Sequence, residues 1–109
     1  MFNFPDDYEK GWTLRAEISK EGIGLHTGLR CRVLIKPTDL PGFHFSFSDE
    51  PGKLITLNVS HVEHTPLCTS LKLNGKKVFT VEHLLASLIG SGITHAHIEI
   101  TGKEIPLLD

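Results

Sequence analysis

One segment of this chain has an apolar spacing that differs from the rest, and that difference constrains the fold more than any other feature. The i, i+3, i+4, i+7 spacing of a core-facing helix is formed by Val81, Leu84, Leu85 and Leu88. It predicts a helix over Val81–Ile89 that is ended by Gly90. Thr80 is expected to be its N-cap, because a threonine hydroxyl can accept a hydrogen bond from the free amides of the first turn.

Elsewhere along the chain, apolar residues alternate with polar ones, as in strands that bury one face. The alternation predicts strands at residues 14–19, 29–35, 43–48, 55–59, 67–73, 76–79 and 95–100. Glu21–Gly28 is expected to form a tight glycine-rich turn, and Asp49–Gly52 another connection. Asn74-Gly75 is a strong hairpin signal, so the strands on either side of it should pair.

These elements predict an α+β fold: a largely antiparallel sheet with one clear helix, Val81–Ile89, packed on one face. One helix can bury only part of one face of a sheet with so many strands, and the sequence stops abruptly at Asp109. We therefore expect a domain over residues 13–109, truncated before a further helix, with residues 1–12 as a loose lead-in.

Composition narrows the functional classes. A net charge of −2 provides no electrostatic footprint for nucleic acid or an anionic membrane. No apolar run approaches the roughly 20 residues that span a bilayer, and the N-terminus lacks the pattern of a signal peptide. Cys31 and Cys68 are far apart, with no C-x-x-C motif. A reduced, cytoplasmic protein is the simplest interpretation, although one disulfide is also compatible with the sequence.

Glu82 and His83 point to chemistry. At about 100° per residue, His83 projects roughly 190° from the centre of the apolar stripe and Glu82 roughly 90° from it, so the core needs neither. A neutral imidazole can bind a metal ion, and an adjacent carboxylate can take a proton from water on that ion. The competing interpretation is a surface histidine beside a glutamate that favours the positive end of the helix dipole. The two-histidine motif H-E-x-x-H is absent.

Other motifs carry weaker signals. The turn Gly22–Gly28 has a glycine spacing that fits neither the dinucleotide fingerprint nor the P-loop. A tight hairpin connection explains its glycines but not His26 at its tip. His95 and His97 could both reach a metal ion, but a solvated sheet face is the simpler interpretation. His61 and His64 are expected to be exposed in a polar loop, and no histidine is near Cys68 to activate it as a nucleophile.

Several separated segments, in this order, resemble one family: Gly22-Ile23-Gly24-Leu25-His26-Thr27-Gly28, Leu67-Cys68-Thr69-Ser70-Leu71, Thr80-Val81-Glu82-His83-Leu84-Leu85-Ala86, Gly92-Ile93 and Glu104-Ile105-Pro106-Leu107-Leu108-Asp109. They look like the amino-terminal domain of UDP-3-O-acyl-N-acetylglucosamine deacetylase, the zinc amidase of lipid A biosynthesis. The likeness runs from about Thr13 to Asp109. The pairing of the glycine turn with the Thr-Val-Glu-His-Leu-Leu helix is the specific part.

The resemblance implies that His83 is one Zn²⁺ ligand and that Glu82 is the general base in hydrolysis of an N-acetyl group. It implies that His26, Leu67 and Cys68 border the substrate cleft, and that the substrate is a UDP-linked acylated amino sugar. The family's remaining zinc ligands and its proton-donating histidine belong to a second domain, which this sequence does not contain. The family also commonly has Asp-Asn where this chain has Thr94-His95, and an aspartate at the position of His64.

The resemblance therefore leads us to expect an amino-terminal fragment that is inactive alone, since three protein ligands are usual at a catalytic zinc ion. A separate second-domain chain is a possible partner; nucleic acid and membrane-spanning segments are not expected. The alternative is a non-catalytic α+β binding module or subunit that keeps the scaffold without the chemistry.

Overall fold

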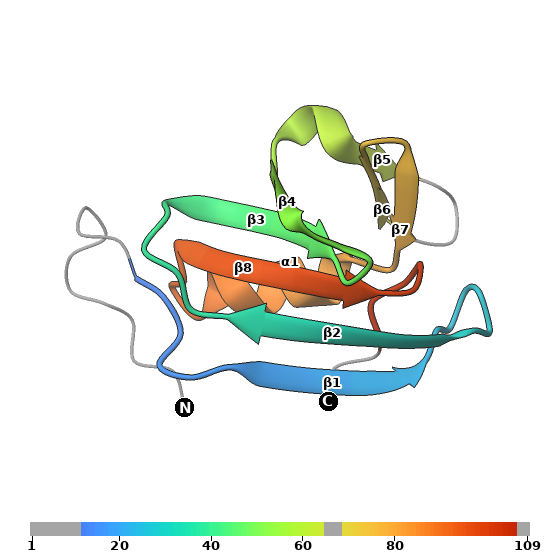
Figure 1. The fold of residues 1–109 in the computed structure, drawn as a ribbon, viewed down its shortest axis with the longest axis horizontal. Helices are drawn as coiled ribbons and strands as arrows, with labels where there is room; N and C mark the ends of the chain where they lie inside the picture. Colours follow the sequence, from blue (N-terminus) through green and yellow to red (C-terminus); the bar gives the residue numbers. More distant parts are fainter. Residues whose placement is uncertain (1–11, 65–68, 107–109) are drawn as a thin grey trace.

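The computed structural model describes residues 12–64 and 69–106. Within these residues the strands form a larger and a smaller sheet, and α1 (Glu82–Gly90) is the α-helix (Figure 1). The elements are, in chain order, β1 (Ile18–Ile23), β2 (Arg30–Lys36), β3 (Gly42–Phe47), β4 (Glu50–Thr56), the 3-10 turn η2 (Val59–His61), β5 (Val62–His64), β6 (Thr69–Leu73), β7 (Lys76–Phe79), α1 (Glu82–Gly90) and β8 (His95–Thr101).

The larger sheet has five strands in the order β1-β2-β8-β3-β4. β3 and β8 run parallel, and every other pair in this sheet is antiparallel. The smaller sheet, β5-β6-β7, is antiparallel throughout. In Figure 1, α1 lies behind the larger sheet, and the smaller sheet stands beyond its β3–β4 edge. The α+β prediction, with a largely antiparallel sheet and a helix on one face, is confirmed.

One apolar core joins both sheets and the helix. The larger sheet contributes alternate residues of three neighbouring strands, among them Val33, Phe45 and Ile98. α1 contributes Leu84 and Leu88, which follow the predicted stripe. The smaller sheet completes the cluster with Leu71, Leu73 and Val78. Full burial of such a side chain contributes about 1.5–3 kcal/mol, so this shared core fixes α1 relative to both sheets.

The hairpin prediction at Asn74-Gly75 is confirmed. Both residues have positive φ, 49° and 81°, as a two-residue type I′ turn requires. β6 and β7 pair across it with Leu73 opposite Lys76. β7 has the predicted bounds, and β6 covers the described part of the predicted strand 67–73.

Several local predictions were wrong, among them the turn Glu21–Gly28, whose first three residues belong to β1. The first strand begins at Ile18, not at Leu14, because β1 is an exposed edge strand whose residues show no burial alternation. The fourth strand begins at Glu50 inside the predicted turn, and the predicted residues 57–59 lie beyond its end. β5, only three residues long, was missed. Trp12 is not loose: its carbonyl oxygen accepts hydrogen bonds from the amides of Thr94 and His95.

Thr80 is not the N-cap of α1, which is the main correction near the site. The N-cap is Val81, and no side chain of residues 12–64 or 69–106 caps the helix. Thr80 instead has a φ of +62°, and its hydroxyl donates to Glu104 Oε2 at 2.6 Å. The hydroxyl is therefore engaged by a buried carboxylate rather than by the helix amides.

α1 has nine residues. Within the described ranges, no helix is long and apolar enough to cross a membrane.

Candidate functional site

Glu82 and His83 lie in the first turn of α1, with neither side chain in the core. His83 is exposed and Glu82 is half-buried, as the helical angles predicted. Because Val81, Leu84 and Leu88 point into the core, the packing of the helix fixes the direction of both polar side chains. No other described residue makes a hydrogen bond or ion pair with His83, so its imidazole is available to a ligand.

The start of β6 holds the start of α1. The Thr69 amide donates to Glu82 Oε2 at 3.3 Å, and the Thr69 carbonyl oxygen accepts from the Val81 amide at 3.2 Å. These two bonds place the Glu82 carboxylate beside the first residue of β6. Leu67 and Cys68, the other predicted cleft residues, precede Thr69 in sequence and lie outside the described residues.

His26 approaches the same region from the β1–β2 turn. Its ring stacks on Phe79, with ring centroids 4.5 Å apart and an angle of 28° between the planes. Phe79 ends β7, three residues before Glu82. The fold thus brings a residue from the glycine turn against the segment that leads into α1.

Glu104 is the residue of this region that sequence reasoning missed as a site residue. Its side chain is fully buried and accepts hydrogen bonds from the amides of His26 at 2.9 Å and Thr27 at 2.8 Å, as well as from the Thr80 hydroxyl. Burial alone would raise the pKa of Glu104, but the bonds from Thr80, His26 and Thr27 hold it below the ordinary value. Glu104 is therefore an anionic group that links two segments of the site.

The glycine turn is built around that carboxylate. A Cβ atom at Gly24 would overlap with the carboxylate of Glu104 and would lie 2.7 Å from Thr27 Oγ1. The three-glycine turn was the available signal for a close approach of this kind, but it did not indicate which side chain approaches.

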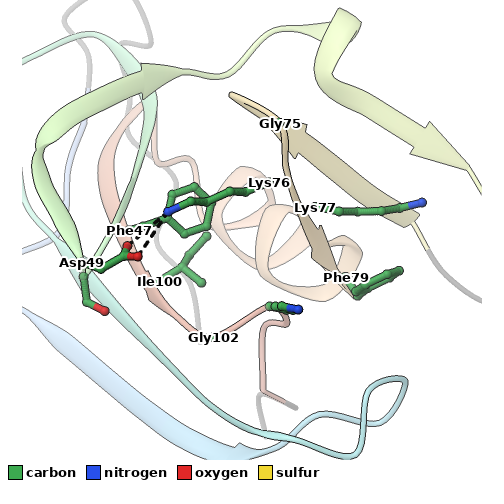
Figure 2. Close-up of a pocket in the computed structure, with 10 residues that line it drawn as sticks. Phe47, Asp49, Gly75, Lys76, Lys77, Phe79, Ile100 and Gly102 are labelled. Carbon is green, nitrogen blue, oxygen red and sulfur yellow. Dashed lines mark hydrogen bonds and ion pairs between the residues drawn. The ribbon is translucent and has the colours of Figure 1, made fainter.

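A groove of about 620 Å³ lies between the β6–β7 hairpin and the end of β8. Figure 2 shows Lys76 and Lys77 projecting to opposite sides of β7, with Lys76 directed toward Phe47 and Asp49. Lys77 Nζ lies 5.4 Å from the centroid of Phe79. Glu82 and His83 do not line this groove, whereas Phe79 does.

The remaining predicted donors are dispersed. His97 Nε2 is 2.7 Å from Ser46 Oγ on the outer face of the larger sheet, and the His61 ring accepts from the Asn58 amide. His95 and His97 are half-buried rather than fully solvated. Across residues 12–64 and 69–106, no group of three or more His, Cys, Asp or Glu side chains could hold a metal ion. The donor set at α1 therefore fits a contribution of one imidazole to a metal site, not a complete site.

Comparison with known proteins identifies the family of this chain. Residues 12–109 match the family model described as LpxC: UDP-3-O-acyl N-acetylglycosamine deacetylase. The chain is 44% identical to a UDP-3-O-acyl-N-acetylglucosamine deacetylase of Trichormus variabilis over 102 residues, which cover 92% of this chain and 36% of the relative. A protein of the same name from Chromohalobacter salexigens is 36% identical over 99 residues, covering 89% of this chain and 33% of the relative.

The chain spans about a third of the length of the curated relatives that it matches. The matched region nevertheless contains the glycine turn, the start of α1 and Glu104. On this match, the chain belongs to the UDP-3-O-acyl N-acetylglycosamine deacetylase family.

Proposed function

We propose that this chain supplies one half of a zinc-dependent deacetylase site that removes the N-acetyl group of UDP-3-O-acyl-N-acetylglucosamine in lipid A biosynthesis. In this proposal His83 is one zinc ligand and Glu82 is the general base. The observation that carries it is the adjacent placement of an unengaged imidazole and an anchored carboxylate at the start of α1, in a chain of this family.

The geometry suits both roles. His83 is exposed and makes no competing polar contact within the described part of the chain, so a ring nitrogen can coordinate an ion through its lone pair. Glu82 is oriented through one carboxylate oxygen, Oε2, by the Thr69 amide, and its other oxygen can hold a proton. A bound zinc ion would supply Lewis acidity, which brings the pKa of a coordinated water close to 7.

The rest of the zinc site is proposed to come from a second domain. A catalytic zinc ion usually has three protein ligands, and α1 contributes one. We therefore expect the 109-residue chain to be inactive alone. His26, Leu67 and Cys68 are proposed as substrate contacts; of these, the described part of the chain places His26 beside Phe79, next to α1.

A chimera tests the proposal. This chain would replace the matched part of the Trichormus variabilis relative, which would supply the remaining two thirds of the protein. The chimera should deacetylate UDP-3-O-acyl-N-acetylglucosamine and contain stoichiometric zinc. Glu82→Ala should abolish turnover and retain zinc, whereas His83→Ala should weaken zinc binding. Glu63→Gln and His61→Ala, an acid and a histidine away from α1, serve as matched controls and should change neither property.

Equal loss of zinc in Glu82→Ala and His83→Ala would contradict these two roles. An active isolated chain would contradict the shared site. The alternative proposal, a binding module without catalysis, rests on the absence of a three-donor cluster from the described residues. It predicts that mixing the chain with a second-domain protein restores no activity.

A further inference from the structure

We propose that Glu104 is a positioning residue, whose buried carboxylate holds the glycine turn bearing His26 in place against the segment that leads to Glu82 and His83. For its effect on catalysis this inference rests on the proposed function. The placement itself is a property of the chain and can be tested without any activity.

The hydrogen bonds of Glu104 connect parts of the chain that are far apart in sequence. Two donors, the amides of His26 and Thr27, are 78 and 77 residues away. The third donor, the Thr80 hydroxyl, is 24 residues away and lies two residues before Glu82. One carboxylate thus fixes both segments, and because it is fully buried, water does not replace a lost donor.

The backbone on each side of Glu104 reinforces the link. Phe79, on whose ring His26 stacks, donates its amide to the Lys103 carbonyl oxygen at 2.9 Å, and its carbonyl oxygen accepts from the Ile105 amide at 3.1 Å. Phe79 and Glu104 form an isolated parallel bridge. The residue under His26 and the residue that binds the His26 amide are therefore joined directly.

Two unusual backbone features are accommodated around this carboxylate. Gly24 is buried where a Cβ atom would overlap with the Glu104 carboxylate. Thr80, a β-branched residue, has a φ of +62°, a conformation that β-branched residues rarely adopt. That conformation places the hydroxyl on Glu104 Oε2. Both features are explained if the position of the carboxylate is what must be kept.

A purely stabilising role would make a different prediction, and His26 provides the readout. Protons of an imidazole stacked on a phenyl face are shielded, so the His26 ring protons should resonate upfield in the folded chain. In Glu104→Ala they should move to the position of an unstacked histidine, and Glu104→Gln should be intermediate, since a carboxamide has one oxygen to accept with. Val33→Ala, a core change on β2, is the control and should lower the melting temperature without moving these resonances.

The chimera described above links the placement to catalysis. Glu104→Ala should lower kcat by about 10²-fold, the loss expected for a misplacement of about 1 Å, with zinc content unchanged and Glu104→Gln retaining part of the activity. Val33→Ala, assayed below its melting temperature, should retain kcat.

The outcomes separate the two proposals. Unmoved His26 resonances in a folded Glu104→Ala chain would overturn the positioning role, and so would a kcat loss no greater than that of Val33→Ala. An inactive unsubstituted chimera would contradict the proposed function instead. The His26 resonances would still show whether Glu104 holds the turn in place.

Discussion

Lys76 Nζ lies 2.8 Å from Glu50 Oε1, so the first residue of β7 in the smaller sheet is bonded to the first residue of β4 in the larger one. The same ammonium group contacts Asp49 at 3.3 Å and lies 4.6 Å above the Phe47 ring. Lys53 Nζ contacts the other oxygen of Glu50 at 2.9 Å. The hydrogen bonds and charges of these two lysines lower the pKa of Glu50 from 4.5 to about 2, and the hydrogen bond from Lys76 is the largest single cause.

Replacing Lys76 with methionine should raise the pKa of Glu50 from about 2 part of the way back to 4.5, because Lys53 remains. A depressed carboxyl pKa stabilises the folded state above the unfolded-state pKa, and that contribution disappears as the pH falls through the folded-state value. The Lys76→Met variant should therefore lose less stability than the parent chain when the pH is lowered from 4.5 to about 2. NMR titration of the Glu50 side chain measures the shift directly.

The neighbouring Lys77 supplies the control for this prediction. Lys77 pairs with Glu63 at 3.9 Å and has no contact with Glu50. Lys77→Met should leave the titration of Glu50 where it is. An equal shift in both variants would mean that the general charge of the hairpin, not the Lys76 contact, sets the pKa.

Gly24→Ala should destabilise the chain by about 1–3 kcal/mol, the usual effect of overpacking a filled site. The added methyl group would overlap with the Glu104 carboxylate, which can move aside only by giving up hydrogen bonds from His26 and Thr27. Thermal unfolding provides the measurement. Gly52→Ala, where nothing lies within 4 Å of the new atom, should change stability by no more than about 0.5 kcal/mol; similar losses at both positions would contradict the steric argument.

Where local chemistry decides the structure, the sequence predicted it well. Asn74-Gly75 fixes a two-residue turn, and so β7 was predicted with its observed bounds, Lys76–Phe79. The helix was predicted within one residue at each end, because Leu84 and Leu88 must face the core. The same angular argument placed His83 outward and Glu82 at the edge of the buried face.

Non-local relationships were beyond such reasoning. β1 is an edge strand exposed on both faces, so it has no apolar period to detect. The parallel pairing of β3 with β8 joins segments about 50 residues apart. Residues near either strand in sequence do not indicate which strand will be its partner. For the same reason the stacking of His26 on Phe79 and the bonds of Glu104 became visible only in the folded chain.

Thr80 offers a matched pair of substitutions. Thr80→Ser keeps the hydroxyl on Glu104 and removes the β-branch at a φ of +62°, so its stability should stay within about 0.5 kcal/mol of the parent or rise. Thr80→Val keeps the shape but removes a hydroxyl donor to the buried carboxylate, which should cost about 1–3 kcal/mol. Chemical denaturation distinguishes them. Equal stability of the two variants would show that the hydroxyl does not matter to Glu104.

His97 makes stability depend on pH near neutrality. Burial lowers its pKa below the ordinary 6.5, and Lys36 and His44 add to this, while Glu99 opposes it. Its Nε2 is 2.7 Å from Ser46 Oγ, and this distance suits a neutral ring that accepts a hydrogen bond from the hydroxyl group. Below 6.5 the unfolded chain binds a proton that the folded chain resists, so the free energy of unfolding should fall as the pH drops from 6.5 through the lower folded-state pKa.

Glu, Asp and the other histidines also titrate during such an experiment, so the slope must be assigned by substitution. His97→Gln leaves an amide oxygen that can accept from Ser46 but removes the titrating group. Its unfolding free energy should therefore fall less between pH 6.5 and mildly acidic conditions than that of the parent chain. If His97→Gln keeps the slope of the parent chain, the neutral ring bonded to Ser46 is not the source of the pH dependence.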